Sequence, residues 1–442
     1  MLLSSHVQDQ CAGAYRILKA PAVEAPPAQR DPGVVARVSE MLRTIESGGL
    51  DAVLTYAREL DGSLGSDLEL TQTEIAAAGD GLSPELRAAL ELGAERTQAF
   101  AAEQRRHLVD FETELAPGLI TGQRYLPVGR VGAYLPAGRF PLLASAFMTV
   151  GVAKAAGVPT VIACTTPQPD GAADEAVVYA AKISGADRIF VLGGVQALAA
   201  MAYGLLDGIG VDMIVGAGNA FVAEAKRQLF GTVAIDLLAG PSEVAVIADD
   251  SADPEIVAAD LLGQAEHGPT SPAVLITTSL QLGEEVIAEA DRQLKTLSTE
   301  PIAGPAWRDH GSVILATDAD TAITLMDDLA PEHLEVITND VDYYHERLRN
   351  YGSIFLGPWS TVAYSDKGMA GTNHVLPTAG GAKHSAGLSV SRFLKPLTYQ
   401  RIAKEATPLL ADAVVAIAGY EKMDAHRATA QRRLDRLGPD RG

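Results

Sequence analysis

Cysteine and positive charge are both scarce in this sequence. Cys11 and Cys164 are the only cysteines among 442 residues, too few for a disulfide framework or a cysteine-based zinc site, so we expect a reducing, cytoplasmic location. Lys and Arg number 35 against 56 Asp and Glu, which gives a net charge of -21. This balance argues against a nucleic-acid partner, because phosphates require a basic face. A small anionic ligand would need a local cationic pocket.

The sequence contains no long apolar run, and a secretory leader is not expected from its first residues. The first ten residues, MLLSSHVQDQ, lack the charged start and the continuous apolar core of a signal peptide. The longest apolar run, around 141–153, ends at Lys154 and falls well short of the roughly 20 residues that span a bilayer. We therefore expect no membrane partner. With 47% hydrophobic residues, the chain is predicted to be globular and long enough for about three domain-sized units.

Helical and strand patterns alternate along most of the chain. Residues 33–60 and 82–108 show apolar positions at helical spacing, and 113–135 contains short β-prone runs broken by Pro and Gly. Apolar runs typical of buried strands then recur about every 25 residues, which is the spacing of βαβ units in a parallel sheet. The expected strands lie at 161–164, 189–192, 213–215, 244–248, 273–277, 312–316, 334–338 and 353–356. Two α/β globules are predicted.

Polar residues at the end of one expected helix predict part of a metal site. Asp253-Pro254 is a strong helix start, and His267-Gly268-Pro269 is an equally strong stop. Gln264 and His267 are therefore expected on one face of the last turn, where both can touch one ion. Imidazole suits zinc, and an amide oxygen is a tolerable partner. By themselves, two such residues more often cap a helix than bind a metal.

A Glu-His pair follows a proline at the junction of a helix and a strand. Pro331 is expected to stop the helix and to leave Glu332 and His333 at a rim, where catalytic groups often lie. Histidine titrates near neutrality, so His333 could take a proton from an alcohol while hydride leaves. Glu332 could activate the water that hydrates an aldehyde. The alternative is a surface glutamate beside a packed histidine.

The usual dinucleotide fingerprint, Gly-x-Gly-x-x-Gly between a strand and a helix, does not occur in the sequence. Two shorter glycine turns, GGVQ at 193–196 and GAGN at 216–219, each open an expected helix. Such turns can present N–H groups to a pyrophosphate. Tight-turn packing is the more common reason for them.

Several long motifs occur together in this chain: QAEHGP at 264–269, Glu332-His333, Asp366, GTNHVLPT at 371–378, and the pair Glu421 and His426. Through them the sequence resembles the histidinol dehydrogenase family. The resemblance implies an α/β fold of two incomplete Rossmann-like globules, with a helical N-terminal region and a helical C-terminal arm exchanged between subunits. The implied domains are 1–135 with 243–390 as the first globule, including the metal and catalytic segments, 136–242 as the dinucleotide globule, and 391–442 as the arm.

The resemblance also implies two cofactors, Zn²⁺ and NAD, and a set of site residues. The implied catalytic pair is Glu332 and His333. The implied zinc ligands are Gln264, His267, Asp366 and His426. The residues implied to bind substrate are Ser242, His374 and Glu421, and those implied to bind NAD are Tyr134, Gln196 and Asn219. Ala217 stands where the family usually has proline, which predicts a looser loop in that cofactor turn.

Because Glu421 and His426 belong to the arm, the resemblance implies a homodimer with shared active sites. A tail that folds back onto its own subunit is the alternative. The implied activity is a zinc-dependent NAD⁺ oxidoreductase that takes a primary alcohol through an aldehyde to a carboxylate, with a small-molecule substrate.

Three features fit the histidinol branch poorly and look more like the sulfopropanediol dehydrogenase branch. Val362 replaces a common acidic residue, the loop 366–371 is one residue longer, and Arg139 adds a positive charge. Arg139 and Lys367 could bind the sulfonate or carboxylate group of a substrate. An L-histidinol dehydrogenase of histidine biosynthesis is the alternative, and Val362→Glu is expected to improve turnover of histidinol.

Two other classes compete with the dehydrogenase hypothesis. A zinc hydrolase would also use a metal, a glutamate and a histidine to activate water. The lack of an HExxH pattern and the match at Gln196 and Asn219 count against it. A non-catalytic paralogue is disfavoured because Glu332 and His333 are intact.

Overall fold

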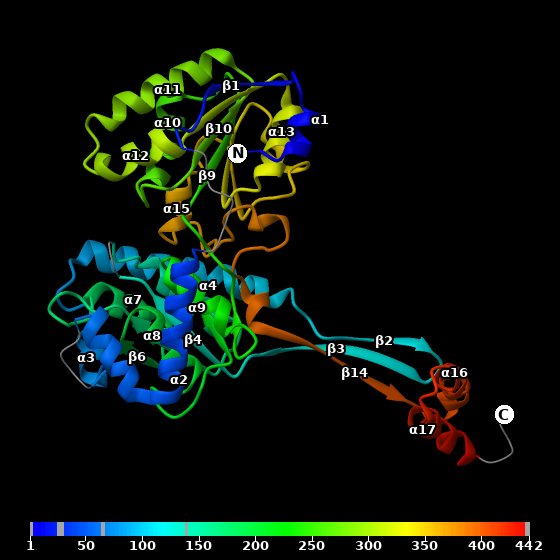
Figure 1. Cartoon of the computed structure of the whole chain (residues 1–442). Coiled ribbons are helices and arrows are strands. Elements are labelled where there is room, and N and C mark those ends of the chain that lie inside the picture. Colours follow the sequence, from blue (N-terminus) through cyan, green and yellow to red (C-terminus); the bar gives the residue numbers. More distant parts are fainter. Residues whose placement is uncertain (1–2, 24–30, 63–66, 138–139, 438–442) are drawn as a thin grey trace. The chain divides into compact units, whose positions relative to one another are not determined.

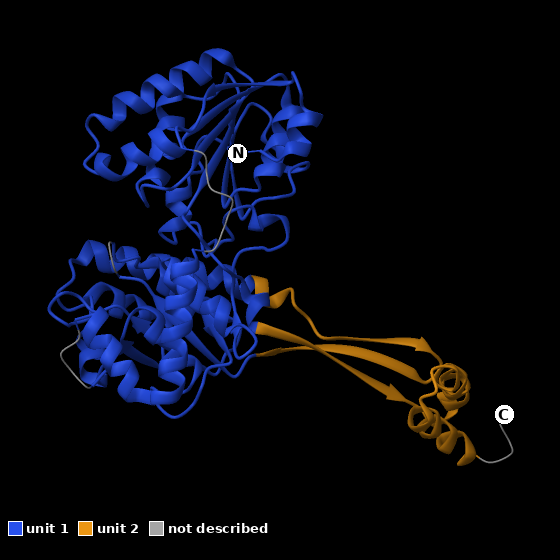
Figure 2. Cartoon of the chain, in the orientation of Figure 1, with its two compact units in different colours: residues 1–103, 128–393 blue, residues 104–127, 394–442 orange. Residues whose placement is uncertain are grey.

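The computed structural model describes residues 3–23, 31–62, 67–137 and 140–437, and Figure 1 shows its helices and strands. The chain divides into two compact units, which Figure 2 distinguishes by colour. Unit 1 contains residues 1–103 and 128–393, and unit 2 contains 104–127 and 394–442. Two largely parallel sheets with helices between their strands make up unit 1. The predicted α/β fold class is confirmed.

One sheet of unit 1 has five parallel strands in the order β6-β5-β4-β7-β8. Numbered along the chain, this is the order 3-2-1-4-5 of a doubly wound fold without its sixth strand. The strand order reverses between β4 and β7, so their carboxyl ends flank the switch point at which such folds bind ligands. The strands are β4 (Arg130–Leu135), β5 (Thr160–Thr165), β6 (Arg188–Val191), β7 (Met213–Val215) and β8 (Ala234–Ile235).

Three helices share one hydrophobic core with this sheet. α2 (Pro32–Leu60) packs against α8 (Gly194–Ala202) and α9 (Ala220–Leu229). α2 begins after Asp31, whose side chain accepts hydrogen bonds from the first free N–H groups of the helix. The expected domain boundaries put this N-terminal helix with the other sheet, and the structure corrects them. The apolar stripe of a helix can cover either sheet, so the sequence alone did not decide between them.

Further helices complete this half of unit 1. α5 contacts β4, and a π-helical turn at Phe147–Gly151 contacts β5. The remaining helices are α3 (Gln72–Ala77), α4 (Pro84–Arg106), α5 (Ala144–Ala146), α6 (Val152–Ala155) and α7 (Glu175–Ser184).

The second sheet has six strands in the order β1-β11-β10-β9-β12-β13, with only β1 antiparallel. Its five parallel strands repeat the order 3-2-1-4-5. α10, α11 and α12 bury one of its faces, while α1, α13 and α14 bury the other. The strands are β1 (Tyr15–Lys19), β9 (Val244–Ala248), β10 (Ala273–Thr277), β11 (Ser312–Ala316), β12 (His333–Ile337) and β13 (Ser353–Leu356). The helices are α1 (Ser5–Gln10), α10 (Pro254–Ala265), α11 (Leu280–Leu294), α12 (Glu300–His310), α13 (Ala319–Leu329), α14 (Val341–His345) and α15 (Val362–Asp366).

Unit 2 combines an antiparallel ribbon with two helices. The ribbon order is β14-β3-β2, from β2 (Phe111–Ala116), β3 (Leu119–Pro127) and β14 (Leu394–Ile402). α16 (Thr407–Tyr420) packs against α17 (Asp424–Asp435). The expected arm began at 391 and was purely helical; the structure adds a strand to it and includes 104–127, because β3 pairs with β14 along its whole length.

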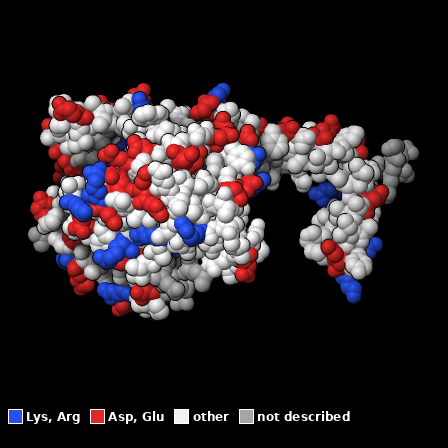
Figure 3. Space-filling model, turned by 90° about the horizontal axis from the view of Figure 1, so that it is seen from above, with Lys and Arg blue, Asp and Glu red and all other residues white. Residues whose placement is uncertain are grey.

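Acidic side chains spread widely over the face seen in Figure 3, with basic ones between them. This distribution agrees with the acidic composition of the chain. Among the described residues, no helix combines the length and the apolar character that a membrane crossing needs.

Candidate active site

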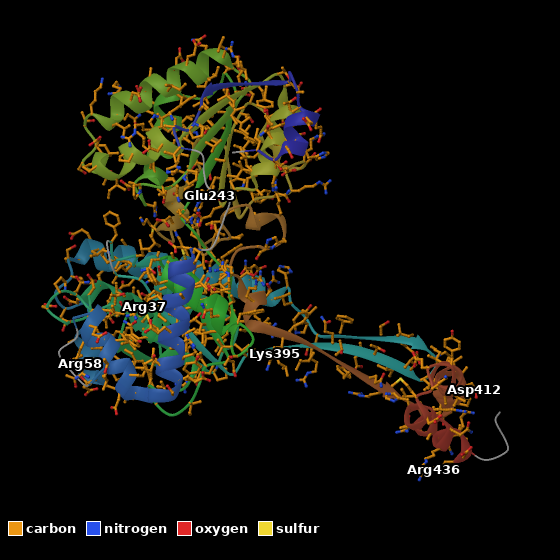
Figure 4. The ribbon with its side chains drawn as sticks, viewed as in Figure 1. Arg37, Arg58, Glu243, Lys395, Asp412 and Arg436 are labelled. Atoms are coloured by element: carbon orange, nitrogen blue, oxygen red, sulfur yellow. The ribbon has the colours of Figure 1, made fainter. Side chains whose placement is uncertain are left out.

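The candidate catalytic residues gather at the amino edge of the six-stranded sheet. β9 and β12 are neighbours, with His333 paired to Val244 in the ladder. Ser242 and Glu243 precede β9, and Glu332 precedes β12, so the turns that enter the two strands place these side chains together. Figure 4 labels Glu243 at this end of the sheet. α10 runs back after β9, which returns Gln264 near its carboxyl end to the same edge.

Hydrogen bonds connect these side chains into one network. Oε2 of Glu332 accepts from Oγ of Ser242 at 2.7 Å and from the backbone N–H of Glu243 at 3.0 Å. Nε2 of Gln264 donates to Oγ of Ser242 and lies 3.4 Å from Nδ1 of His333. Four residues that the sequence singled out separately are therefore brought into contact.

His333 is buried and bonded at both ring nitrogens. Nδ1 lies 2.9 Å from the carbonyl oxygen of Glu243, and Nε2 lies 3.0 Å from Nδ1 of His374. A carbonyl can only accept, so Nδ1 of His333 carries a proton. Burial by itself lowers the pKa of His333, but the charge of Glu332 and the hydrogen bonds to Glu332 and Glu243 outweigh it and raise the pKa above the ordinary value. The result is an imidazole well suited to accept a proton at Nε2.

His374 is the complementary neutral imidazole. Burial and the neighbouring His333 lower its pKa to about 3. Neutral His333 accepts at Nε2, which places the proton of His374 on Nδ1 and leaves a lone pair on Nε2. That Nε2 atom is buried and has no hydrogen-bond partner in the part of the chain that the structure describes. A lone pair held in this way suits a metal ion or a substrate hydroxyl.

Three of the four expected zinc ligands lie in unit 1. α10 ends at Ala265, so His267 follows the helix rather than lying in its last turn, although its N–H still bonds to the carbonyl of Gln264 at 3.2 Å. Asp366 ends α15 and pairs with Nζ of Lys367 at 2.5 Å. Burial would raise the pKa of Asp366, but Lys367, His374 and His267 together hold it below the ordinary value.

This donor set fits a cation such as zinc. It offers an ionised carboxylate, imidazole nitrogens and an amide oxygen, the ligand types that zinc accepts. Within the described ranges, no group of three His, Cys, Asp or Glu side chains is arranged to hold a metal by itself. Glu421 caps the end of α16, and His426 lies in the first turn of α17; both are exposed on unit 2.

The expected cofactor residues lie at the carboxyl edge of the five-stranded sheet, beside its switch point. The hydroxyl of Tyr134, near the end of β4, accepts from the N–H of Gly194 at 3.1 Å. Gly216, after β7, has a φ of +117°, and a Cβ there would lie 2.2 Å from the carbonyl oxygen of Tyr134, so only glycine fits. Asn219 caps α9 by accepting from the N–H groups of Phe221 and Val222.

Gln196 is buried in the first turn of α8. Its Nε2 donates to the carboxylate of Asp61 at 2.9 Å, and its Oε1 has no partner among the described residues. Asp61 also accepts from the N–H of Gly193. A carboxylate therefore occupies part of the helix start at which the sequence predicted contact with a pyrophosphate.

Two acidic residues at these sites were not singled out as titrating or bonded groups from the sequence. Burial and then the charge of Glu332 raise the pKa of Glu243 to about 7, which brings a second titrating carboxyl to the catalytic pair. The available signal was its position after Gly240-Pro241-Ser242 and directly before a buried strand. Asp61 gave no signal, because only the fold carries the end of α2 to the turn after β6.

The three residues that suggested an anionic substrate differ in their surroundings. Lys367 has a side chain that is 65% exposed, and Arg139 lies outside the described residues. Val362 is buried in the core beside α10, and its N–H bonds to Glu335 at 2.9 Å. That Val362→Glu improves histidinol turnover stays a prediction, and the structure adds that a glutamate there would place a second carboxylate in this core beside Glu335.

The profile of the histidinol dehydrogenase family matches residues 25–434. The chain belongs to this family. Its members are NAD-dependent dehydrogenases acting on CH–OH groups, so the expected enzyme class is confirmed. The crystal structure of histidinol dehydrogenase from Elizabethkingia anophelis superposes with a TM-score of 0.88 at 32% identity, covering 93% of this chain and 94% of that one.

Curated relatives match over almost the whole chain. A histidinol dehydrogenase homolog from Shouchella clausii is 47% identical over 91% of this chain and 94% of its own. The sulfopropanediol 3-dehydrogenase of Ruegeria pomeroyi is 44% identical, covering 91% and 93%. Histidinol dehydrogenase of the same organism is 41% identical, covering 92% and 93%.

Proposed function

We propose that this chain is a zinc- and NAD-dependent dehydrogenase that oxidises a small primary alcohol, through an aldehyde, to a carboxylate. The observation that carries the proposal is the bonded set of Glu332, His333 and His374 at the amino edge of the six-stranded sheet. Gln264, His267, Asp366 and His426 would hold the zinc. When bound, zinc would polarise the substrate oxygen and NAD would accept hydride.

The side chains of the site divide the proton transfers. Nδ1 of His333 is held by the carbonyl of Glu243, so Nε2 is the atom left to take the alcohol proton. His374 now faces that nitrogen, which marks the position of the substrate hydroxyl. Oε2 of Glu332 is occupied by Ser242 and Glu243, and its other oxygen is left to activate the water that hydrates the aldehyde.

We further propose that the substrate is a small hydroxylated anion such as a sulfonated diol, and that Lys367 contacts its charged group. One support is that a buried valine, Val362, stands in place of an acidic residue. The other is that, of two relatives from Ruegeria pomeroyi, the sulfopropanediol 3-dehydrogenase shares more sequence identity with this chain than the histidinol dehydrogenase does. L-Histidinol is the second candidate, because histidinol dehydrogenases match over nearly the same length.

Substrate choice is tested by NADH formation with sulfopropanediol, its uncharged parent diol and L-histidinol. We expect the sulfonate to give the highest kcat/KM. Lys367→Gln should raise KM for the sulfonate about 10–100-fold, the worth of one charge-assisted hydrogen bond. It should change KM for the neutral diol far less, while loss of the pair with Asp366 affects kcat for both substrates alike. Lys383→Gln is the matched control, since Lys383 pairs with Asp328 elsewhere on the surface. Best turnover of L-histidinol by the unmodified enzyme would contradict the proposal.

We also propose a homodimer in which α16 and α17 complete the partner's site. Four large apolar side chains of α16 are 41% to 91% exposed: Leu409, Val414, Ile417 and Tyr420. At about 100° per residue they fall within an arc of about 140°, so they form one stripe. An exposed apolar stripe of this kind marks a protein–protein contact, and the same unit carries Glu421 and His426.

Subunit mixing tests this arrangement. Inactive His333→Asn protein reassembled with inactive His426→Ala protein should regain about a quarter of the wild-type activity, because half of random dimers are mixed and each mixed dimer has one intact site. Mixing His333→Asn with His267→Ala is the control. Both of those changes lie in unit 1, so no activity should return. Confirmed subunit exchange without recovery in the first mixture would favour a site closed within one chain.

A further inference from the structure

Two acidic residues lie on the same strand and helix as the proposed catalytic and metal-binding residues, close to them in the sequence. Glu335 follows His333 by two residues in β12, so both side chains point to the same face of the strand. Asp260 precedes Gln264 by four residues in α10, so both lie on the same face of the helix. Glu335 is fully buried, and Asp260 is partly buried. The mechanism described above uses neither of them.

Both acids hold the start of α15, the short helix that ends at Asp366. Oε1 of Glu335 accepts from the N–H of Val362 at 2.9 Å. Oδ1 of Asp260 accepts from the hydroxyl of Thr361 at 2.8 Å, and Thr361 is the residue that caps α15. Two carboxyls, from a strand and from a helix, therefore fix the first turn of the element that presents Asp366.

The two carboxyls also lie close together, because the residues that they bind, Thr361 and Val362, are neighbours in the chain. Oε2 of Glu335 is buried, and no N–H or O–H donor among the described residues reaches it. A buried carboxylate oxygen without a donor is costly, and a proton shared by the two acids removes that cost.

Among the residues that the structure describes, no Lys or Arg compensates the pair. Glu335 lies between Val246 of β9 and Phe355 of β13 in the ladder, and α10 contributes Asp260. His333 is the nearest titratable group on the face of β12 itself, and neither acid forms an ion pair with a Lys or Arg in the described part of the chain. Burial, and then the charge of Asp260, raise the pKa of Glu335 well above its ordinary value, and burial raises that of Asp260.

We propose that Glu335 and Asp260 share one proton at neutral pH and act as a positioning pair, which joins the strand of His333, the helix of Gln264 and the short helix of Asp366. The positioning role rests on the function proposed for those three residues. The shared proton does not, because it follows from the burial of the two acids, their bonds to neighbouring residues and the missing donor at Oε2 of Glu335.

The proton is tested by thermal unfolding of the wild type and Glu335→Gln between pH 5 and pH 9. A folded pKa raised above the unfolded one gives stability that is complete below the unfolded pKa and is lost as pH rises toward the folded one. Glutamine keeps the bonds to Val362 and Asp260 without needing a proton. We expect the difference in Tm between Glu335→Gln and the wild type to shift in favour of the variant as pH rises, by about 3 °C or more at pH 8.

Glu346→Gln is the matched control, since the side chain of Glu346 is 75% exposed; its Tm should differ from the wild type by a constant amount. A Tm difference for Glu335→Gln that does not change with pH would overturn the shared proton.

The positioning role is tested by titrating the whole chain, in the oligomeric state that it adopts in solution, with zinc against a competing chelator. Glu335→Gln and Asp260→Asn should keep zinc affinity within about threefold of the wild type, because each retains the bond. Glu335→Ala and Asp260→Ala should weaken it by about 10–100-fold, the usual effect of losing a group that supports a ligand.

Wild-type zinc affinity in both alanine variants would overturn the positioning role. If an alanine variant does not fold, its amide counterpart is measured instead. A tenfold loss of zinc affinity in Glu335→Gln or Asp260→Asn overturns the positioning role, and wild-type zinc affinity in these variants supports it. If the wild type itself binds no zinc, the function proposed above fails, while the dependence of Tm on pH still decides the shared proton.

Discussion

Replacing His333 by asparagine is expected to slow alcohol oxidation by about 10²–10⁴-fold, the usual contribution of a general base. Asparagine can keep a hydrogen bond to the carbonyl of Glu243, so the loss should appear in kcat rather than in folding. The measurement is the steady-state rate of NADH formation, with Tm as the check on folding. His384→Asn, an exposed histidine, is the matched control and should retain wild-type rates.

Glu332→Gln separates the two oxidation steps. It should impair conversion of supplied aldehyde to acid more than oxidation of the alcohol, because only the second oxidation consumes water. Wild-type rates for both substrates in both variants would remove the pair from the mechanism.

Chelation is expected to abolish activity, and Zn²⁺ is expected to restore it. His267→Ala should lose most of the bound metal and nearly all activity, because a distorted site can no longer polarise the substrate oxygen. His267 is half-buried and follows the end of α10, so its loss should leave the fold intact. Metal content per chain and Tm are the two measurements.

The control for the metal prediction is His384→Ala, which should keep one zinc per subunit. Full metal content in His267→Ala would show that this residue is not a ligand. Activity that survives complete removal of metal would contradict the proposed function as a whole.

The fold was predictable where local pattern and packing agree. The buried runs at 244–248 and 273–277 are strands with those bounds, because a fully buried parallel strand reads as a continuous apolar run. The partner of α2 was not predictable, since its stripe fits either sheet. The ribbon was also missed, because β3 and β14 are distant in the sequence and nothing local specifies their pairing.

The candidate site was predictable where several polar residues share a motif. Gln264, Ser242, Glu332 and His333 do meet in the structure. Glu335 was missed because a single acid in a strand reads as a solvent-facing residue, and its burial depends on α10 and α15. The burial of Val362 was not predictable for a related reason, since its position four residues before Asp366 does not indicate which way its side chain points from a five-residue helix.

The pairing of β14 with β3 has a consequence for shortening the chain. β3 is the central strand of the ribbon, bonded on one side to β2 and on the other to β14. Removing only 394–442 would strip one side of β3 and leave a row of open N–H and C=O groups along nine residues, a template for aggregation through strand addition. A soluble truncation must therefore delete 104–127 together with the tail and rejoin Glu103 to Val128.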